Sequence, residues 1–222
     1  MTSKIASDCQ ASNTINYTNH WDSVYSKTAT DALGWYEATS APTLQLIEAC
    51  KLPKDATILN VGSGSSTLID DLLDLKYSNI IASDLSLEAL SQLKKRLKAA
   101  AENVQYIVDD LTNSIALKHL KNIDLWNDRA VLHFFLTIAE RTAYFNLLRR
   151  IVKKNGYVII ATFAKEGAKK CCGLDVYRYN TAMLQESLGT DFELLKTVDY
   201  TFTNPNGDPR PYVYTLFKRV NI

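Results

Sequence analysis

The chain has 222 residues, 46% of them hydrophobic and 22% charged, a composition typical of a globular protein that folds without metals or disulfides. The 25 basic residues are balanced by 24 acidic ones, which argues against the basic surface that nucleic-acid-binding proteins usually carry. Because we find no apolar stretch of bilayer-spanning length, no signal segment and no heptad pattern, we expect a monomeric cytoplasmic protein that binds neither nucleic acid nor membranes.

Residues 1–15 are rich in Ser, Thr, Asn and Ala, which predicts a disordered leader, and residues 16–222 show no linker or repeat, which indicates a single domain. Apolar runs then alternate with helical patterns. The runs are nearly continuous in Ile, Val and Leu, as in strands buried on both faces: Thr57–Val61, Asn79–Ser83, Val104–Val108, Ile123–Asn127 and Tyr157–Phe163. The helical patterns cover Ala41–Cys50, Ser66–Leu75, Leu87–Ala99 and Ile138–Lys153. This alternation predicts a parallel sheet with right-handed crossovers.

The C-terminal part follows a different pattern. Glu193–Thr203 and Tyr212–Val220 are rich in Tyr, Thr, Val and Phe, and only a turn-forming loop connects them. Strands joined so briefly must be antiparallel. We therefore predict an α/β three-layer sandwich whose seven-stranded, mostly parallel sheet ends in an antiparallel hairpin. Asn155 and Gly156 are predicted to cap the last long helix and turn the chain into the next strand.

The four cysteines are at positions 9, 50, 171 and 172. Their spacing matches no zinc site, and the adjacent pair Cys171 and Cys172 is too close for an ordinary disulfide. We expect free thiols in a reducing compartment and no metal site.

The first strand leads into a glycine-containing turn, with the sequence NVGSGSS at residues 60–66. Gly62 and Gly64 let the chain turn sharply and let a ligand approach the backbone. The helix that follows offers free N–H groups to an anionic group. A Gly-x-Gly pair alone is explained equally well by a structural turn.

Two aspartates strengthen the binding interpretation. Asp84 ends the second strand, where a carboxylate accepts hydrogen bonds from ribose hydroxyls, and Asp110 follows the third strand, where a carboxylate can hold an exocyclic amine. Each alone is more often a cap or turn residue. Together they line one crevice, because parallel strands end at the same edge of a sheet. A nicotinamide-dependent dehydrogenase would share the turn and Asp84, but its third glycine is replaced by Thr67, and it does not explain Asp110.

With these residues, the chain resembles the class I S-adenosylmethionine-dependent methyltransferases over residues 17–220. The resemblance implies that S-adenosylmethionine is the cofactor and S-adenosylhomocysteine the product. It also implies a set of cofactor-binding residues in the turn and after the second and third strands: Gly62, Ser63, Gly64, Asp84, Leu85, Asp110 and Leu111. The chain departs from the family pattern at Asn60, usually acidic, and at Ser66, usually glycine.

A narrower resemblance covers residues 20–25 and 34–37. These segments are similar to the N-terminal part of small methyltransferases that include the elongation-factor and citrate-synthase lysine methyltransferases. The similarity implies that Trp21, Tyr25 and Trp35, or its neighbour Tyr36, close over the cofactor. Tyr36 is also a candidate for contact with the acceptor. Aromatic faces suit a sulfonium cation, which they attract by about 0.5–2 kcal/mol. For Trp35, simple packing against the sheet is an equally open interpretation.

The fourth strand leads into NDRAVLHFF, residues 127–135, which the resemblance places beside the transferred methyl group. Asn127 and Arg129 would then contact the cofactor, and Asp128 is the candidate base near the acceptor. His133 lies on a Phe-rich helical face and is expected in the core.

The long connection at residues 165–179 is of a kind that usually carries function, and we place Arg178 and Tyr179 in the acceptor pocket. The acceptor itself is left open between a protein lysine and a small molecule. The alternative function is a non-catalytic cofactor- or partner-binding module, suggested by the altered turn at Asn60 and Ser66.

Overall fold

The computed structural model describes residues 15–221, so the predicted leader falls almost entirely outside the described residues. A seven-stranded sheet has the order β3-β2-β1-β4-β5-β9-β8. Its strands are β1 (Thr57–Val61), β2 (Asn79–Asp84), β3 (Val104–Val108), β4 (Ile123–Arg129), β5 (Val152–Phe163), β8 (Phe192–Thr203) and β9 (Pro209–Arg219). The first five are parallel, while β9 runs antiparallel to both β5 and β8. The predicted fold class and terminal hairpin are confirmed.

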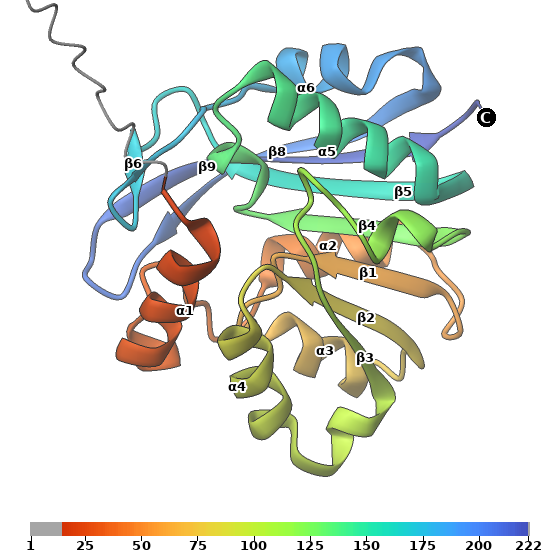
Figure 1. Cartoon of the computed structure of the whole chain (residues 1–222). Coiled ribbons are helices and arrows are strands. Elements are labelled where there is room, and N and C mark those ends of the chain that lie inside the picture. The colour runs from red at the N-terminus through yellow and green to blue at the C-terminus, as the bar shows by residue number, and fades with distance from the viewer. Residues whose placement is uncertain (1–14, 222) are drawn as a thin grey trace, which may run out of the picture.

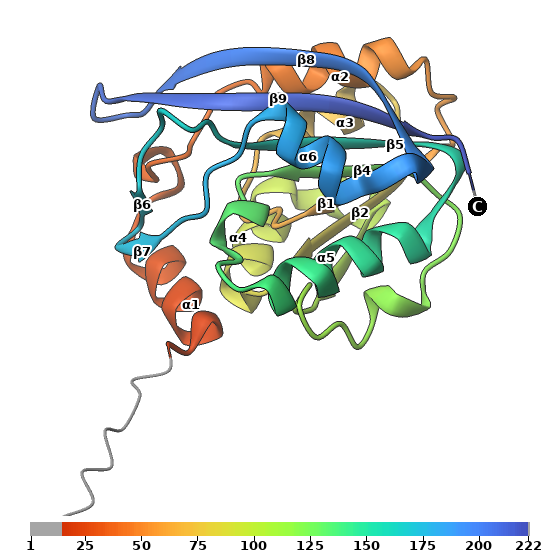
Figure 2. The ribbon, with the colours of Figure 1, turned by 90° about the horizontal axis from the view of Figure 1, so that it is seen from above.

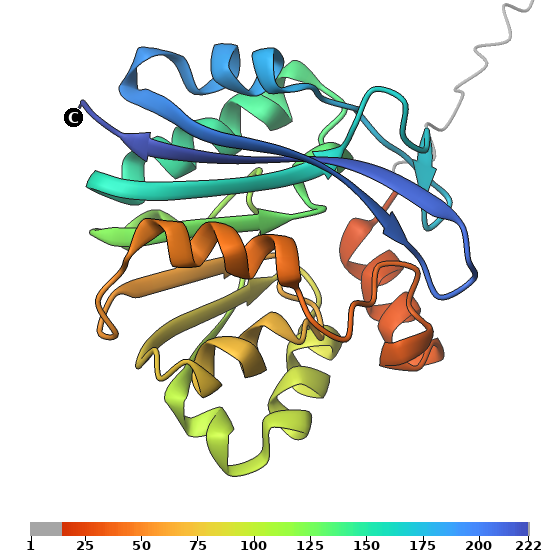
Figure 3. The ribbon, with the colours of Figure 1, turned by 180° about the vertical axis from the view of Figure 1, so that it is seen from behind.

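Helices cover both faces of the sheet (Figures 1 and 3). They are α1 (Tyr17–Lys27), α2 (Ala41–Cys50), α3 (Leu68–Asp74), α4 (Leu87–Leu97), α5 (Ile138–Ile151) and α6 (Thr181–Leu188). One apolar core lies between the sheet and α2, α3 and α4, centred on residues such as Leu46, Ile69 and Leu93. The second lies under α5 and α6 and includes Trp126 and Leu148. Buried side chains therefore alternate along each central strand between two cores, as the apolar runs predict.

Helix α1 lies apart from these layers, at one end of the sheet. Figure 2 shows it beside a small hairpin, β6 (Lys170–Cys171) and β7 (Leu174–Asp175), at the end that the β8–β9 turn also approaches. Helix α1 and the β6–β7 hairpin thus lie at the edge of the sheet where the parallel strands end. Of the residues the structure describes, none form a helix of the length and hydropathy that membrane crossing requires.

The end of α5 differs from the prediction. The helix stops at Ile151, and Asn155 and Gly156 lie inside β5, at a bulge where the β4–β5 register shifts. Asn155 adopts the left-handed conformation, with φ of 62°. The helix end needs no glycine cap, because the Arg219 guanidinium on β9 donates to the carbonyls of Arg149 and Val152. A cap supplied by a residue so distant in sequence leaves no local signal.

Gly156 provides a test of this bulge. A Cβ atom there would lie 2.9 Å from the carbonyl oxygens of Ile123 and Lys153, which are backbone atoms and cannot move cheaply. We expect Gly156→Ala to lower the free energy of unfolding by about 1–3 kcal/mol, measured by urea denaturation. Gly34→Ala is the matched control, because nothing lies within 4 Å of its Cβ position. Equal stability of the two variants would contradict the close approach.

Candidate active site

Two adjoining cavities open at the ends of the parallel strands. The larger has a volume of about 990 Å³ and opens to solvent, and the smaller has a volume of about 530 Å³. Trp35, Gly62 and Arg129 border both.

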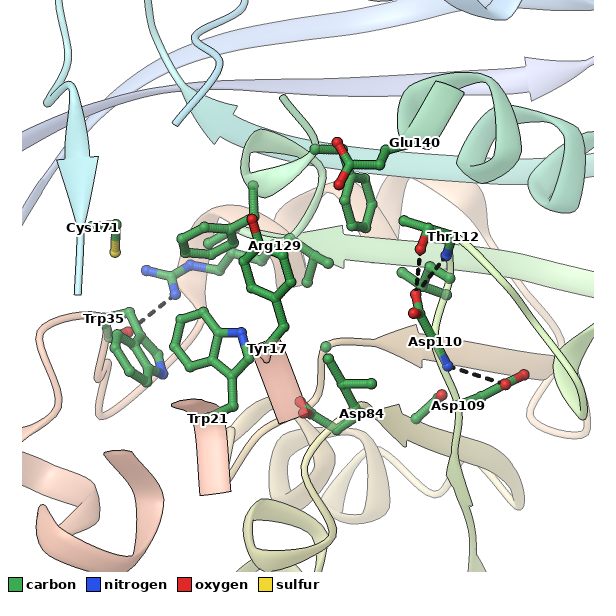
Figure 4. Close-up of a pocket in the computed structure, with 18 of the residues that line it drawn as sticks. Tyr17, Trp21, Trp35, Asp84, Asp109, Asp110, Thr112, Arg129, Glu140 and Cys171 are labelled. Atoms are coloured by element: carbon green, nitrogen blue, oxygen red, sulfur yellow. Dashed lines mark hydrogen bonds between the residues drawn. The ribbon is translucent and has the colours of Figure 1, made fainter. Parts of the chain in front are cut away.

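Most residues predicted for the site border these cavities. The larger is lined by Trp21, Tyr25, Trp35, Gly62, Asp84, Leu85, Asp110, Leu111 and Arg129. The smaller is lined by Trp35, Tyr36, Gly62, Ser63, Asn127 and Arg129. Figure 4 shows the larger cavity with Asp84 and Asp110 on one side and Trp35 and Cys171 on the other. The structure thus brings together residues from α1, the glycine turn and the ends of three strands.

Asp84 is held by the two turns that surround it. Its carboxylate accepts hydrogen bonds from the backbone N–H groups of Gly64, at 2.7 Å, and Ser86, at 2.8 Å. Burial raises the pKa of Asp84 to about 6, although these hydrogen bonds partly offset the effect. The carboxylate therefore faces the cavity in a fixed orientation and is ionised only above that pH.

Asp109 and Asp110 have different roles: Asp109 stabilises the loop after β3, and Asp110 faces the cavity. The buried Asp109 carboxylate accepts five hydrogen bonds, from Asp110 N, Ser114 Oγ, Ile115 N, Ala116 N and Leu117 N. Burial acts to raise the pKa of Asp109, but these hydrogen bonds outweigh it and lower the pKa. Asp109 thereby fixes the loop that presents Asp110 to the cavity. Asp110 uses Oδ1 to accept from Thr112 N and Oγ1, at 2.8 and 2.7 Å.

The two glycines of the turn adopt the left-handed conformation, with φ of 57° and 51°. The space that their missing side chains leave is filled by protein. A Cβ on Gly62 would lie 1.9 Å from Val131 Cγ2, and one on Gly64 would lie 2.1 Å from the Tyr25 hydroxyl oxygen. Gly64 therefore lies beneath Tyr25 and lines neither cavity, so its predicted contact with the cofactor stays a prediction.

A chain of amides runs beneath the smaller cavity. Asn127 Nδ2 donates to Asn60 Oδ1, and Asn60 Nδ2 donates to Ser63 Oγ at 3.1 Å. Asn60 replaces the acidic residue that is usual in the family. Its side-chain oxygen still accepts a hydrogen bond from Asn127, and its side-chain nitrogen donates to Ser63 in the glycine turn. Asn127 Oδ1 is buried without a hydrogen-bond partner among the described residues, and Asn127 lines the smaller cavity. An unpartnered buried acceptor calls for a donor from a ligand or a water molecule.

Arg129 connects the N-terminal segment to the terminal hairpin. Its guanidinium donates to the Trp35 carbonyl at 3.1 Å and to the Tyr214 hydroxyl at 3.2 Å, and it pairs with Glu37 at 3.0 Å. It also lies over the rings of Phe202 and Tyr212. These contacts fix the wall that separates the two cavities.

Helix α1 covers the larger cavity and is attached to α4. Asp22 Oδ1 accepts hydrogen bonds from Ser86 Oγ at 2.5 Å and Glu88 N at 3.3 Å, and Gln92 donates to the Tyr25 carbonyl at 2.7 Å. The helix projects Trp21 and Tyr25 inward, where both rings pack edge-to-face against Trp35. The predicted aromatic cover over the cavity is thus present in the structure.

Asp128 does not occupy the position expected of a base. It is fully buried and lines neither cavity. Its carboxylate accepts hydrogen bonds from Val131 N, Leu132 N and the Tyr144 hydroxyl. Asp128 supports the segment after β4, and the candidate base is corrected to a structural residue. Side chains alternate along a strand, so Asn127 and Arg129 reach the cavities while Asp128 points to the opposite face.

The residues predicted for the acceptor pocket from the long connection are also corrected. Arg178 donates to the carbonyls of Lys165 and Gly167, and Tyr179 belongs to the core beneath α5 and α6. Neither lines either of these two cavities. His133 is buried as expected, and burial lowers its pKa to about 3.

Several residues at the cavities are not among the predicted site residues. Tyr17, Phe134, Phe135 and Glu140 line the larger cavity, and Glu37 lies beside Arg129. Arg96 on α4 is also not among the predicted site residues: its guanidinium donates to the carbonyls of Ser65 and Ser66 and pairs with Asp70. Arg96 thereby stabilises the backbone of the glycine turn at Ser65 and Ser66.

Comparisons with known proteins agree with this geometry. Residues 59–160 match a family model described as a methyltransferase domain. A SAM-dependent methyltransferase from Anabaena variabilis superposes with a TM-score of 0.73 at 16% identity, over 93% of this chain and 96% of that one. A second similar structure is 1,6-didemethyltoxoflavin-N1-methyltransferase from Burkholderia thailandensis with bound S-adenosylhomocysteine, with a TM-score of 0.63, 17% identity, and coverage of 82% and 78%. Residues 59–160 therefore match a methyltransferase domain, and the chain has the fold of the class I, S-adenosylmethionine-dependent methyltransferases, as the resemblance implies.

Within this class, the chain is similar to human EEF1A lysine methyltransferase 2. The two are 24% identical over 158 residues, which make up 64% of this chain and 66% of the human protein. The aligned region thus spans just under two thirds of that relative's length.

The role of Arg96 can be measured. We expect Arg96→Ala to weaken binding of S-adenosylhomocysteine by roughly three- to tenfold, because the turn loses two charge-assisted hydrogen bonds at a partly exposed position. Calorimetric titration measures the change. Lys95→Ala, which removes an exposed neighbouring charge, is the control and should bind normally. Weakening of the same size in both variants would show that net charge, and not support of the turn, is responsible.

Proposed function

We propose that this protein binds S-adenosylmethionine in the two adjoining cavities and transfers its methyl group to the Nζ atom of a lysine in a protein. The observation that carries the cofactor assignment is the placement of two carboxylates, Asp84 and Asp110, on one side of the larger cavity, beside the glycine turn. This arrangement suits a nucleoside, with Asp84 accepting from the ribose hydroxyls and Asp110 from the adenine amine.

The smaller cavity suits the amino-acid half of the cofactor. Asn127 Oδ1 is a buried acceptor without a partner among residues 15–221, as an ammonium group requires. Ser63 borders the same space. Leu85 and Leu111 line the larger cavity, where they would pack against the adenine, and Leu111 also offers its backbone N–H to a ring nitrogen.

When bound, S-adenosylmethionine supplies an electrophilic methyl group on a sulfonium centre. The role of the protein is to orient the reactants and to exclude water, which can contribute several kcal/mol. Trp21, Tyr25 and Trp35 line the larger cavity, and Trp35 also borders the smaller one. Aromatic ring faces attract cations by about 0.5–2 kcal/mol. The attachment of α1 to α4 holds these rings in place.

The lining of the larger cavity also suits a lysine acceptor. Tyr17, Phe134 and Phe135 contribute aromatic rings to it, and Glu140 contributes a carboxylate. Aromatic walls accommodate an aliphatic side chain, and a carboxylate attracts the approaching ammonium group. The similarity to human EEF1A lysine methyltransferase 2 supports the same acceptor class.

The acceptor amine must be neutral before it attacks. Transfer of a lysine from water into apolar surroundings lowers its pKa, so the amine can release its proton to water at the rim. The mechanism then needs no dedicated base, in agreement with the buried, fully engaged position of Asp128. The non-catalytic alternative rested on Asn60 and Ser66. Asn60 keeps its contact with Asn127, and Ser66 Oγ accepts from Leu68 N at 3.2 Å, so neither substitution disturbs the turn.

The pKa of Asp84 makes cofactor binding depend on pH. We expect binding of S-adenosylhomocysteine to strengthen as pH rises through about 6, because the ionised carboxylate is the better acceptor for ribose hydroxyls. Below that pH the affinity should fall by up to tenfold per pH unit. Calorimetry on the wild type and Asp84→Asn measures this. The same pH dependence in the variant would contradict the assignment and point to Asp128, whose pKa burial also raises to about 6.

The acceptor class can be tested with cofactor carrying a tritiated methyl group. The purified chain is incubated with a lysate, and labelled protein is hydrolysed for amino-acid analysis. We expect the label in methylated lysine. Label confined to the acid-soluble fraction would replace the lysine assignment by a small-molecule acceptor, and cofactor binding without transfer would support a non-catalytic module.

Glu140→Gln provides a matched variant for the same assay. Glutamine preserves the capping box that Glu140 forms with Thr137, so the helix start is retained while the charge is removed. We expect transfer to lysine to fall by about fivefold, corresponding to about 1 kcal/mol of charge interaction near water, with unchanged binding of S-adenosylhomocysteine. Unaltered transfer would exclude Glu140 from acceptor recognition.

A further inference from the structure

The adjacent cysteines border the active-site cavity but have no part in the proposed methyl transfer. Cys171 ends β6 and lines the larger cavity, on the side of Trp35 and across from Asp84 (Figure 4). Cys172 follows it and is exposed to solvent. The pair therefore joins the cavity wall to the molecular surface.

The two cysteines lie where β6 turns into β7. Neighbouring side chains on a regular strand point to opposite faces, but Cys172 has a φ of 50°, in the left-handed region that only glycine enters readily. Gly173 completes the turn with a φ of 78°. The mutual influence of the two neighbouring thiols raises the pKa of Cys171 and lowers that of Cys172. The left-handed turn therefore lies at the two adjacent cysteines.

The hairpin is fixed at its base, so the position of the cysteines does not depend on a loose loop. Cys171 pairs with the buried Leu174 across the strands, and Val176 N donates to the Lys169 carbonyl at 3.1 Å. Arg178 holds the preceding segment through the Lys165 carbonyl. The backbone that carries both cysteines is therefore held on both sides of the turn.

The chemistry of the pair favours a ligand that takes two thiols. Within residues 15–221, no group of three or more His, Cys, Asp or Glu side chains is arranged to hold a metal ion. Adjacent cysteines also lie closer together than ordinary disulfide geometry requires. Two thiols can occupy two of the three bonding positions of a trivalent element such as arsenic, while an organic group occupies the third. Thiolates are soft ligands and prefer soft elements of this kind.

We propose that Cys171 and Cys172 form a dithiol site for monosubstituted trivalent arsenic at the wall of the active-site cavity. Two sulfur–arsenic bonds form, and the two thiol protons leave with the arsenic-bound oxygen as water. Arsenic remains trivalent, so the step needs no oxidant or reductant. Cys172 gives access from solvent, and the Cys171 sulfur places the bound group in the cavity.

Phenylarsine oxide is the probe. The reduced full-length chain is treated with it and washed with an excess of a monothiol, which removes adducts held by a single sulfur, and intact mass is measured. We expect one phenylarsenic group per chain, bound with loss of one water molecule and released by 1,2-ethanedithiol. The measurement needs no methyl donor, so its outcome is independent of the proposed methyl transfer.

Single substitutions decide whether the pair is responsible. Cys172→Ser and Cys171→Ser should each abolish the retained adduct, and the exposed position of Cys172 makes the first variant compatible with normal folding, checked by thermal unfolding. Cys9→Ser and Cys50→Ser are the matched controls and should retain it, since burial raises the pKa of Cys50 to about 12. Absence of an adduct on the wild type, its retention in Cys172→Ser or its loss in a control would overturn the proposal.

Discussion

The buried pairing of Arg129 with Glu37 is the interaction on which the site depends. Their side chains are 13% and 7% exposed, so each charge is largely removed from water and is stabilised by the other. Breaking such a pair by removing one partner typically costs about 3–5 kcal/mol, because the remaining charge stays buried. The same guanidinium contacts the Trp35 carbonyl and the Tyr214 hydroxyl, so it joins the N-terminal segment, β4 and the terminal hairpin around one charge.

The parallel order of the central strands explains how simple patterns predicted most of the site. Apolar runs define the strands, and parallel pairing brings their carboxyl ends to one edge. The strand pattern therefore predicts that Asp84, Asp110 and the glycine turn lie at the same edge of the sheet. The aromatic residues of α1 were predicted through a resemblance, since their spacing alone equally describes packing onto a sheet.

The predictions that were wrong concern directions and partners that the local sequence does not encode. Asp128 lies between two residues that reach the cavities, and strand alternation turns it toward Tyr144 instead. Tyr179 follows a long connection yet belongs to the core. Gly156 resembled a helix cap because the actual cap, Arg219, lies far along the chain. In each case a tertiary contact determines the role, and a single sequence does not specify that contact.

Helix α1 and α4 share a cap, which has a consequence for how the cavity can open. Ser86 caps α4 by accepting from Ala89 N, and Asp22 of α1 accepts from the Ser86 hydroxyl and from Glu88 N. The first turn of α4 is therefore completed by a residue of the helix that covers the cavity. Withdrawal of α1 removes that residue, so opening of the cover and fraying of the turn behind Asp84 form one cooperative unit. Access to the nucleoside half of the site is, in this sense, a local unfolding equilibrium.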